Sequence, residues 1–265
     1  MSQRCQQRTP NRDSNGERRA PFGSAVITWP VTARPHQIID IYLGDPFRLR
    51  NEGGPLETAP ETVVVGPHRS RRTQLYLSGE LHLFNILFQP AGLNRLTGID
   101  MTALVNEGIA ARGVLGKRAS LLSDAVRSAS DFPSRVVAAE RWFGNLLDEA
   151  PPEDGIEHTS RLLLATRGRV RIDSLVKRSG LSARHFQRRF TTRVGLSPKL
   201  YARTSRFDAA LIAHRNAPAK SWAEIVYDAG YFDQAHFVRE CHALVGAAPS
   251  QFIGDWDNIF FPVHG

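Results

Sequence analysis

Two stretches of the sequence decide the fold: HFQRRFTTRVGLSP at residues 185–198 and HFVRECHALVGAAP at residues 236–249. They lie 51 positions apart and share six identical residues in register, far more than chance would give. Upstream the spacing becomes 50, and the matched pairs there are Leu175 and Ile225, Val176 and Val226, and Gly180 and Gly230. The sequence therefore predicts a helical unit used twice, called here the first unit (residues 172–198) and the second unit (residues 222–249).

The last helix of the first unit is predicted to have two different faces. At about 100° per residue, Phe186 and Phe190 fall opposite a polar stripe. That stripe consists of Arg184, Gln187 and Arg188. Guanidinium and amide groups pair with guanine and adenine edges in the major groove of DNA. These three side chains are therefore predicted to read bases, although an ordinary solvated helix face has the same composition.

The second unit has less polar chemistry at the corresponding outward positions. Gln234, Ala235, Val238 and Arg239 occupy them. Ala235 and Val238 donate no hydrogen bond, but such side chains can touch a thymine methyl group. We therefore expect the first unit to contribute more sequence discrimination than the second.

The turns of the two units and their flanks suggest contacts to the DNA backbone. Gly180 is predicted to supply the tight bend of a helix-turn-helix, and Ser182 and Asp233 to cap the following helices. Basic side chains and helix caps at these positions would bind DNA phosphates without reading the base sequence. The candidates are Lys177, Arg178, Ser182, Arg189, Arg193, Lys199, Arg203 and Asp233, the last as an N-cap.

Helical periodicity continues through the rest of this half of the chain. Helices are expected at residues 161–165, 172–178, 182–193, 198–214, 222–229 and the segment after Asp233, with a last short one beginning at Pro249. The helix at 198–214 would join the two units. His185 and His236 are interpreted as structural or phosphate-contacting, and Cys241, which corresponds to Phe190, as a small core residue.

These residues resemble the DNA-binding domain of AraC/XylS-type transcription regulators. In the second unit the resemblance rests on AEIVYDAGYFDQAHFVR at residues 223–239 and on GAAP at 246–249, followed by Phe252. In the first unit it rests on LSARHFQRRF at 181–190, on GLSP at 195–198 and on Tyr201; the joining helix adds Arg206, Ala210 and Leu211. Cys241 and Val245 depart from the pattern, since the family usually has aromatic residues there.

The resemblance implies a function for the whole chain. It implies two helix-turn-helix units that bind double-stranded promoter DNA over two successive major grooves, and a contact with RNA polymerase such as activators make. It also implies that the N-terminal half is a partial cupin that binds a small-molecule effector or pairs two chains as a homodimer. The turn at residues 88–92 carries this weaker likeness. No reaction, cofactor or metal is expected.

The N-terminal half has its own pattern. Strands are expected at 26–27, 38–43, 62–65, 74–77 and 81–88, and helices at 118–129 and 134–147. The expected class is α+β: a small antiparallel sheet or partial barrel with helices, then an all-α double helix-turn-helix domain. The expected divisions are an arm (1–22, disordered), a sensor or dimerisation domain (23–150), a linker (151–157), the DNA-binding domain (158–253) and a tail (254–265).

Charge and cysteine content agree with this interpretation. Residues 161–252 hold 16 Lys and Arg against 6 Asp and Glu, a net charge of +10, whereas residues 21–160 hold 13 against 16, a net charge of −3. A basic half beside a slightly acidic one favours a polyanion-binding module joined to another domain. The two cysteines, Cys5 and Cys241, lie too far apart for a Cys-based zinc site and fit a reducing compartment. No secretory signal or membrane span is predicted, and so a cytoplasmic protein associated with the bacterial nucleoid is expected.

Several other interpretations stay open for the N-terminal half. His68, Glu80 and His82 could converge on a metal, although surface positions are the commoner case. Arg69, Arg71 and Arg72 could receive an acidic effector, or form a solvated loop. Residues 118–147, with Trp142, Phe143, Leu146 and Leu147, could form a dimer face or pack on the sheet.

Three rival functions also remain. A cupin-type oxygenase or isomerase tethered to DNA would carry stoichiometric iron or zinc. A repair protein with a methyl-accepting cysteine would have to use Cys5. An architectural DNA binder would show salt-sensitive binding without a preferred site.

Overall fold

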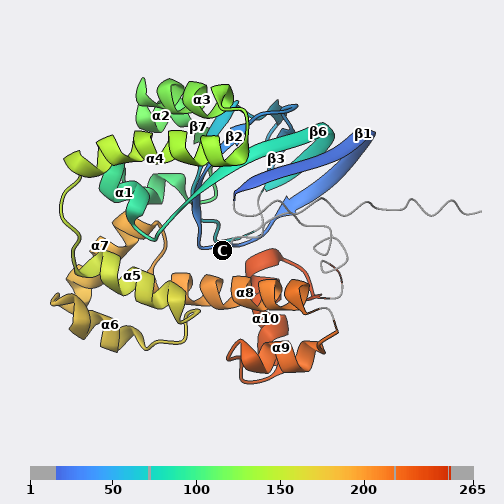
Figure 1. The fold of residues 1–265 in the computed structure, drawn as a ribbon. Coiled ribbons are helices and arrows are strands. Elements are labelled where there is room, and N and C mark those ends of the chain that lie inside the picture. The colour runs from blue at the N-terminus through green and yellow to red at the C-terminus, as the bar shows by residue number, and fades with distance from the viewer. Residues whose placement is uncertain (1–15, 71–72, 218, 250, 252–265) are drawn as a thin grey trace, which may run out of the picture.

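A computed structural model of the chain describes residues 16–70, 73–217, 219–249 and 251. Strands occupy most of the N-terminal half and helices the C-terminal half, which confirms the predicted α+β class. Figure 1 shows the sheet with α2, α3 and α4 against one side and the remaining large helices, α5 to α10, gathered below it. Among the described residues, no helix combines the length and the apolar character needed to cross a membrane.

The sheet is antiparallel and is built around one long strand. Its order is β4-β3-β6-β2-β5-β7, and β1 pairs with β6 on the other side. The strands are β1 (Glu17–Val31), β2 (Gln37–Tyr42), β3 (Arg48–Asn51), β4 (Leu56–Thr58), β5 (Thr62–Val65), β6 (Thr73–Phe88) and β7 (Gly108–Ala110).

Side chains of the sheet alternate between two apolar layers, as the two-residue period of a strand requires. In β2, Ile39 and Ile41 belong to a core that includes residues of the covering helices, whereas Ile38 and Tyr42 belong to a second core on the opposite, concave face. The predicted strand at 38–43 is thereby confirmed with both of its faces buried.

The covering helices are α1 (Gly92–Thr97), the 3-10 helix η1 (Met101–Leu104), α2 (Ala111–Leu115), α3 (Arg118–Ser128) and α4 (Phe132–Glu149). Trp142 and Phe143 of α4 pack against the outer core of the sheet, and Leu146 is buried. These three residues of α4 are therefore used for packing on the sheet. The exposed Leu121 and Leu147 leave the prediction of a dimer face open.

Three strand expectations differ from the structure. The runs at 74–77 and 81–88 are one strand, β6, which passes through Gly79 at a φ of 73°. Strand β1 starts at Glu17, inside the range expected to be a disordered arm, because its polar residues pair with β6 far along the chain. Strands β3, β4 and β7 were not predicted, since they are short and their residues are exposed or half-buried, without a buried alternation. Residues 1–15 and the expected tail lie outside the described residues.

The segment expected to be a linker, residues 151–157, also differs. Helix α5 (Gly155–Ala165) begins within it, and Asp154 and Glu157 form a capping box at the start of the helix. Acidic residues at this spacing satisfy free backbone N–H groups and begin a helix. The extended part of the connection is therefore shorter than expected.

A buried ion cluster ties β1 to α4. The guanidinium of Arg135 donates to both carboxylate oxygens of Glu17, at 3.0 and 2.9 Å, and His82 of β6 lies 2.6 Å from Oε1 of the same carboxylate. Burial alone would raise the pKa of Glu17, but the hydrogen bonds from His82 and Arg135 outweigh it and hold the pKa below its usual value. The start of β1 is thus fixed by charge pairing as well as by the strand ladder.

Replacing Glu17 by Gln should lower the free energy of unfolding by about 3 kcal/mol at neutral pH, because Arg135 stays buried without its carboxylate. A carboxyl group with a lowered folded pKa contributes stability above its unfolded pKa, which is about 4.5, and loses that contribution as the pH falls through the folded value. Urea unfolding of both proteins should therefore show a gap that shrinks in acid. A gap that is the same at neutral pH and in acid would contradict this assignment.

The two halves of the chain touch at a defined contact. Nε2 of His36, just before β2, lies 2.9 Å from Oδ2 of Asp208, and the side chain of Gln37 donates to the carbonyl of Val194 at 3.3 Å. Gly195, with a φ of 92°, lies so close to η1 that a Cβ atom there would be 2.9 Å from the carbonyl oxygen of Met101. The sheet domain therefore rests on the C-terminal end of a predicted recognition helix.

Candidate DNA-binding surface

The first unit forms a helix-turn-helix. Helix α6 (Ile172–Ser179) ends at Gly180, whose φ of 70° is one that glycine adopts without strain. The hydroxyl of Ser182 then accepts a hydrogen bond from the backbone N–H of His185 at the start of α7 (Ala183–Val194). The predicted turn, N-cap and helix of this unit are all confirmed.

Helix α7 carries the two faces that its sequence predicts. Phe186 and Phe190 are buried in the core that α7 shares with α5, α6 and the start of the joining helix. Arg184, Gln187 and Arg188 are exposed. Among the residues that the structure describes, no ion pair or hydrogen bond holds the side chains of these three. The polar stripe is therefore free to meet another molecule.

The second unit has the same form. Helix α9 (Trp222–Asp228) precedes α10 (Gln234–Val245), and Oδ1 of Asp233 accepts from the backbone N–H of His236 at 2.6 Å. The predicted outward residues Gln234, Ala235, Val238 and Arg239 are all exposed. On the inner face, Phe237 stacks on Trp222 with ring centroids 5.3 Å apart, and Cys241 is fully buried, as predicted.

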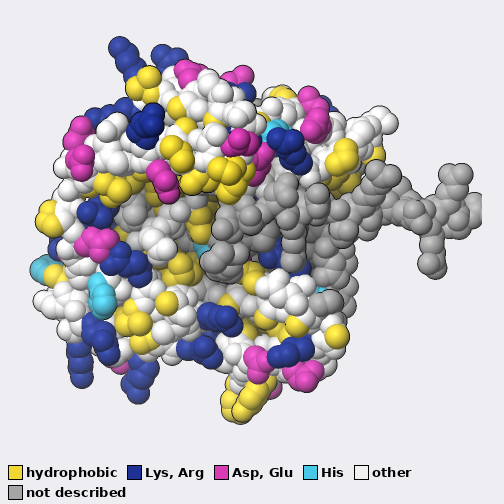
Figure 2. All heavy atoms as spheres, viewed as in Figure 1, with side chains coloured by type: hydrophobic (Ala, Val, Ile, Leu, Met, Phe, Trp, Pro, Cys, Tyr) yellow, Lys and Arg dark blue, Asp and Glu magenta, His cyan; other side chains and the backbone are white. Residues whose placement is uncertain are grey.

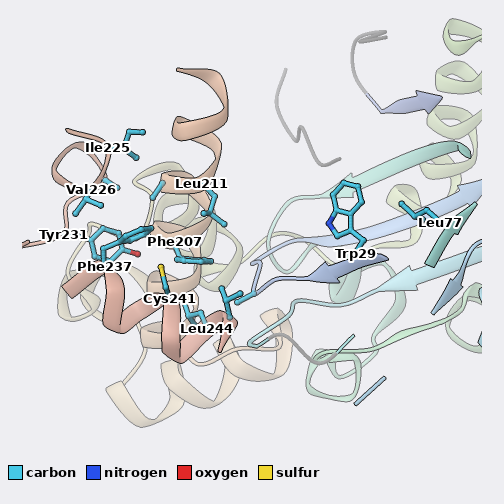
Figure 3. Close-up of a cluster of buried hydrophobic side chains, with 14 residues drawn as sticks. Trp29, Leu77, Phe207, Leu211, Ile225, Val226, Tyr231, Phe237, Cys241 and Leu244 are labelled. Carbon is cyan, nitrogen blue, oxygen red and sulfur yellow. The ribbon is translucent and has the colours of Figure 1, made fainter. Parts of the chain in front are cut away.

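Helix α8 (Pro198–Asn216) fixes one unit relative to the other. Tyr201 and Ala202, near its start, belong to the core of the first unit. Phe207, Ala210 and Leu211, further along, belong to the core that holds the second unit. Figure 3 shows Phe207 and Leu211 beside the buried side chains of α9 and α10, with Trp29 and Leu77 on the strands. A single rigid helix that is part of both cores sets the spacing of α7 and α10.

The predicted phosphate contacts fall into three groups. Lys177, Arg178 and Lys199 are exposed, and Figure 2 shows Lys and Arg side chains projecting at the lower left, over α6. Ser182 and Asp233 serve as caps through their side-chain oxygens, and a carboxylate such as that of Asp233 does not attract a phosphate.

Three of the predicted phosphate contacts form ion pairs with carboxylates of the protein itself. Arg189 lies 2.6 Å from Asp154, and Arg203 pairs with Glu240 at 2.9 Å. Arg193, only 16% exposed, lies 2.9 Å from Glu157 and 2.8 Å from Asp154. These arginines fasten α7 to the start of α5 and α8 to α10. Their contacts with DNA phosphates stay predictions. Their partners lie too far along the chain for spacing to reveal them.

A hollow inside the sheet domain is a second candidate site. Its volume is about 70 Å³, and apolar side chains such as Leu75, Leu77 and Val63 form most of its walls. Arg34, Asp40 and His68 supply the polar groups. Burial, and after it the charge of Arg34, holds the pKa of His68 well below its ordinary value. Mostly apolar walls with a few polar groups are typical of pockets for small molecules.

The histidine cluster considered from the sequence is not formed. His68 is buried beside the hollow, whereas His82 is bound to Glu17 on another part of the sheet, and Glu80 is exposed. The expectation that these histidines are surface residues was therefore wrong for His68. Arg69 is exposed, and Arg71 and Arg72 lie outside the described residues. Among the described residues, no group of three or more His, Cys, Asp or Glu side chains could hold a metal ion.

Two helix-turn-helix units on a shared helix, each with an exposed face on its second helix, define a DNA-binding protein. Comparison with known families agrees: residues 175–254 match the family described as "Helix-turn-helix domain". These residues form an AraC-type helix-turn-helix domain, and the chain is accordingly a DNA-binding transcription regulator. The sequence matched none of the curated proteins with which it was compared.

Solved structures of similar fold come from ToxT of Vibrio cholerae. One ToxT crystal structure has a TM-score of 0.51 and 11% identity, covering 91% of this chain and 99% of ToxT. Another, from strain O395, has a TM-score of 0.50 and 10% identity, covering 92% and 98%. A third, at 0.50 and 10%, covering 91% and 98%, is ToxT bound to (E)-4-(8-methylnaphthalen-1-yl)but-3-enoic acid. At this identity the likeness establishes the shared fold of both halves.

Proposed function

We propose that the chain reads an operator through α7 and α10 placed in two successive major grooves on one side of the duplex. The observation that carries this proposal is that α8 belongs to both unit cores, because a rigid spacer sets a fixed spacing between two reading helices. Arg184, Gln187 and Arg188 read bases in one groove; Gln234, Ala235, Val238 and Arg239 face the other. Lys177, Arg178 and Lys199 hold phosphates. The test is to select an operator from random DNA and measure affinity across single-base changes.

The first unit should discriminate more strongly between bases than the second. Arg184→Ala removes a group able to make two hydrogen bonds to guanine, and should relax the preference at one base pair by about 1–3 kcal/mol. Val238→Ala removes only apolar contact and should cost less than about 1 kcal/mol. Both variants are compared on the same panel of single-base operator changes. Equal loss of discrimination in the two would refute the asymmetry.

We also propose that a small apolar molecule occupies the hollow and modulates DNA binding. Support comes from the apolar walls, from the few polar groups at one place in them, and from the bound aryl-butenoic acid in the ToxT structure of the same fold. The hollow is also close to the DNA-binding domain along the chain. Arg34 and His68 line it, while the neighbouring His36 and Pro67 meet Asp208 and Gly195. A displacement of the residues that line the hollow would therefore be transmitted directly to α7 and α8.

Filling the hollow should abolish the response to such a molecule. Wild-type protein with (E)-4-(8-methylnaphthalen-1-yl)but-3-enoic acid at about 100 times its Kd should gain about 2.7 kcal/mol of stability, seen as a rise in Tm. Leu75→Trp, which places an indole in the hollow, should show no rise and should still bind the operator. Val26→Trp, at an exposed position of β1 that does not line the hollow, is the matched control and should respond like wild type. A normal response from Leu75→Trp would contradict the assignment.

The remaining expectations of the family stand as proposals. We propose that the protein acts without catalysing a reaction, that it contacts RNA polymerase at the promoter, and that two chains pair through the sheet domain. The resemblance of the DNA-binding residues supports the first two, and the exposed Leu121, Val137 and Leu147 on α3 and α4 support the third.

A further inference from the structure

The turn of the second unit contains one more residue than that of the first. Between the glycine that ends the first helix of the unit and the N-cap of the second, the first unit has Leu181 alone, whereas the second unit has Tyr231 and Phe232. This extra residue is the cause of the change in spacing from 50 to 51 between the two copies. The added residue has to be accommodated without disturbing the packing of the two helices.

Tyr231 takes over the packing role that Leu181 has in the first unit. Leu181 packs against the first core, whereas Tyr231 is buried and meets the ring of Phe237 edge-on, with centroids 5.2 Å apart. The apolar residue directly before an N-cap commonly packs on the fourth residue of the helix, which is Phe237 in α10. In the second unit Tyr231, one position further from the cap, makes that contact in place of Phe232. Phe232 is therefore not needed for the core.

Phe232 is instead 89% exposed, the most exposed of the large apolar side chains among the described residues. It stands immediately before Asp233, the cap of the recognition helix, beside Gln234 and Ala235. Figure 2 shows hydrophobic side chains projecting at the bottom of the molecule beside α9. An exposed benzyl group costs solubility and contributes nothing to this fold, and so its position next to the reading face points to a binding role.

We propose that Phe232 is a specificity-determining residue that contacts a thymine methyl group in the groove read by α10. This inference rests on the proposed function. Apolar contact is the means by which a side chain without donors distinguishes thymine. Phe232, Ala235 and Val238 then form an apolar reading surface at the start of α10, with Gln234 and Arg239 beside it. The second unit thus reads methyl groups where the first unit reads hydrogen-bonding edges.

The test uses the full-length chain and its selected operator, with each thymine of the second half-site replaced in turn by deoxyuridine, which lacks only the methyl group. At one position the wild type should lose about fourfold in affinity, the value expected for one buried methyl. Phe232→Ala should bind the thymine operator at least about fourfold more weakly than the wild type does. Replacing the same thymine by deoxyuridine should cause no further loss of its affinity. Because Phe232 is exposed, the Tm of the Phe232→Ala variant should match that of the wild type.

Tyr227→Ala is the matched control, since Tyr227 is an aromatic residue of the same unit that is 78% exposed on α9. It should keep the wild-type sensitivity to deoxyuridine. The inference is overturned if Phe232→Ala remains sensitive to the missing methyl, or if it binds DNA normally and loses only transcriptional activity, which would indicate a protein partner. A wild-type chain that selects no operator at all would instead refute the proposed function.

Discussion

Replacing Arg188 and Arg239 together by alanine is expected to weaken operator binding by at least about 30-fold. The two residues occupy matching positions of the two units, and both are exposed. Each can form a bidentate pair with a guanine, which is worth about 1–3 kcal/mol of discrimination. Because the proposed complex places them in separate grooves, the losses should add. Affinity for operator and for unrelated DNA should be measured at one salt concentration, because both depend on it.

The comparison with unrelated DNA separates base reading from charge. The double variant should lose far more affinity for the operator than for unrelated DNA, so that footprints across the genome lose their shared motif. Arg112→Ala with Arg118→Ala is the matched control, since it removes two exposed charges from α2 and α3 of the sheet domain. Its operator affinity should stay within about twofold of wild type. A parallel loss on operator and unrelated DNA would mean that Arg188 and Arg239 hold phosphates only.

Replacing Phe190 by alanine should destabilise the DNA-binding domain by about 3–5 kcal/mol. Its ring is fully buried between those of Phe186 and Tyr201, with centroids 5.6 and 5.7 Å away. Removing it leaves a cavity beneath α7 and in the contact between α7 and α8. Urea unfolding should show the loss, and operator binding should weaken as α7 loses its support.

The matching position in the second unit provides the control. Cys241 is also fully buried, but it fills far less space, and the stacked rings of Trp222 and Phe237 fill the surrounding core. Burial raises the pKa of its thiol to about 12, so it stays protonated and inert at neutral pH. Cys241→Ala should therefore cost only about 1 kcal/mol. Similar losses for the two variants would contradict the account of how the two units are packed.

The helices of the DNA-binding domain could be predicted closely because their signals are local. In the first unit, the cap Ser182, the glycine at 180 and the opposed faces of α7 lie within a few turns of one another, and in the second unit Asp233 stands directly before α10. Their exposed base-reading candidates follow from the same periodicity. Hence the sequence predicts the double unit and its polar stripe without any knowledge of long-range contacts.

Contacts between distant segments were not predictable in this way. Glu17 meets Arg135 across 118 positions, and Arg193 meets Glu157 across 36. Spacing along the chain carries no sign of such pairs. For that reason the sequence predicts neither the pairing of the start of β1 with β6 nor the ion pairs of Arg193. The sequence does not predict the hollow for the same reason, since its walls come from strands β1, β2, β3, β5, β6 and β7 and from the loops between them.

A hydroxyl-radical footprint of the full-length protein on its selected operator tests the central claim most directly. The account predicts two protected patches on the same side of the duplex, about one helical turn or 10 base pairs apart, because α8 holds α7 and α10 at a fixed spacing. Arg188→Ala should weaken one patch and Arg239→Ala the other. A single patch, or protection spread evenly without a preferred sequence, would contradict it.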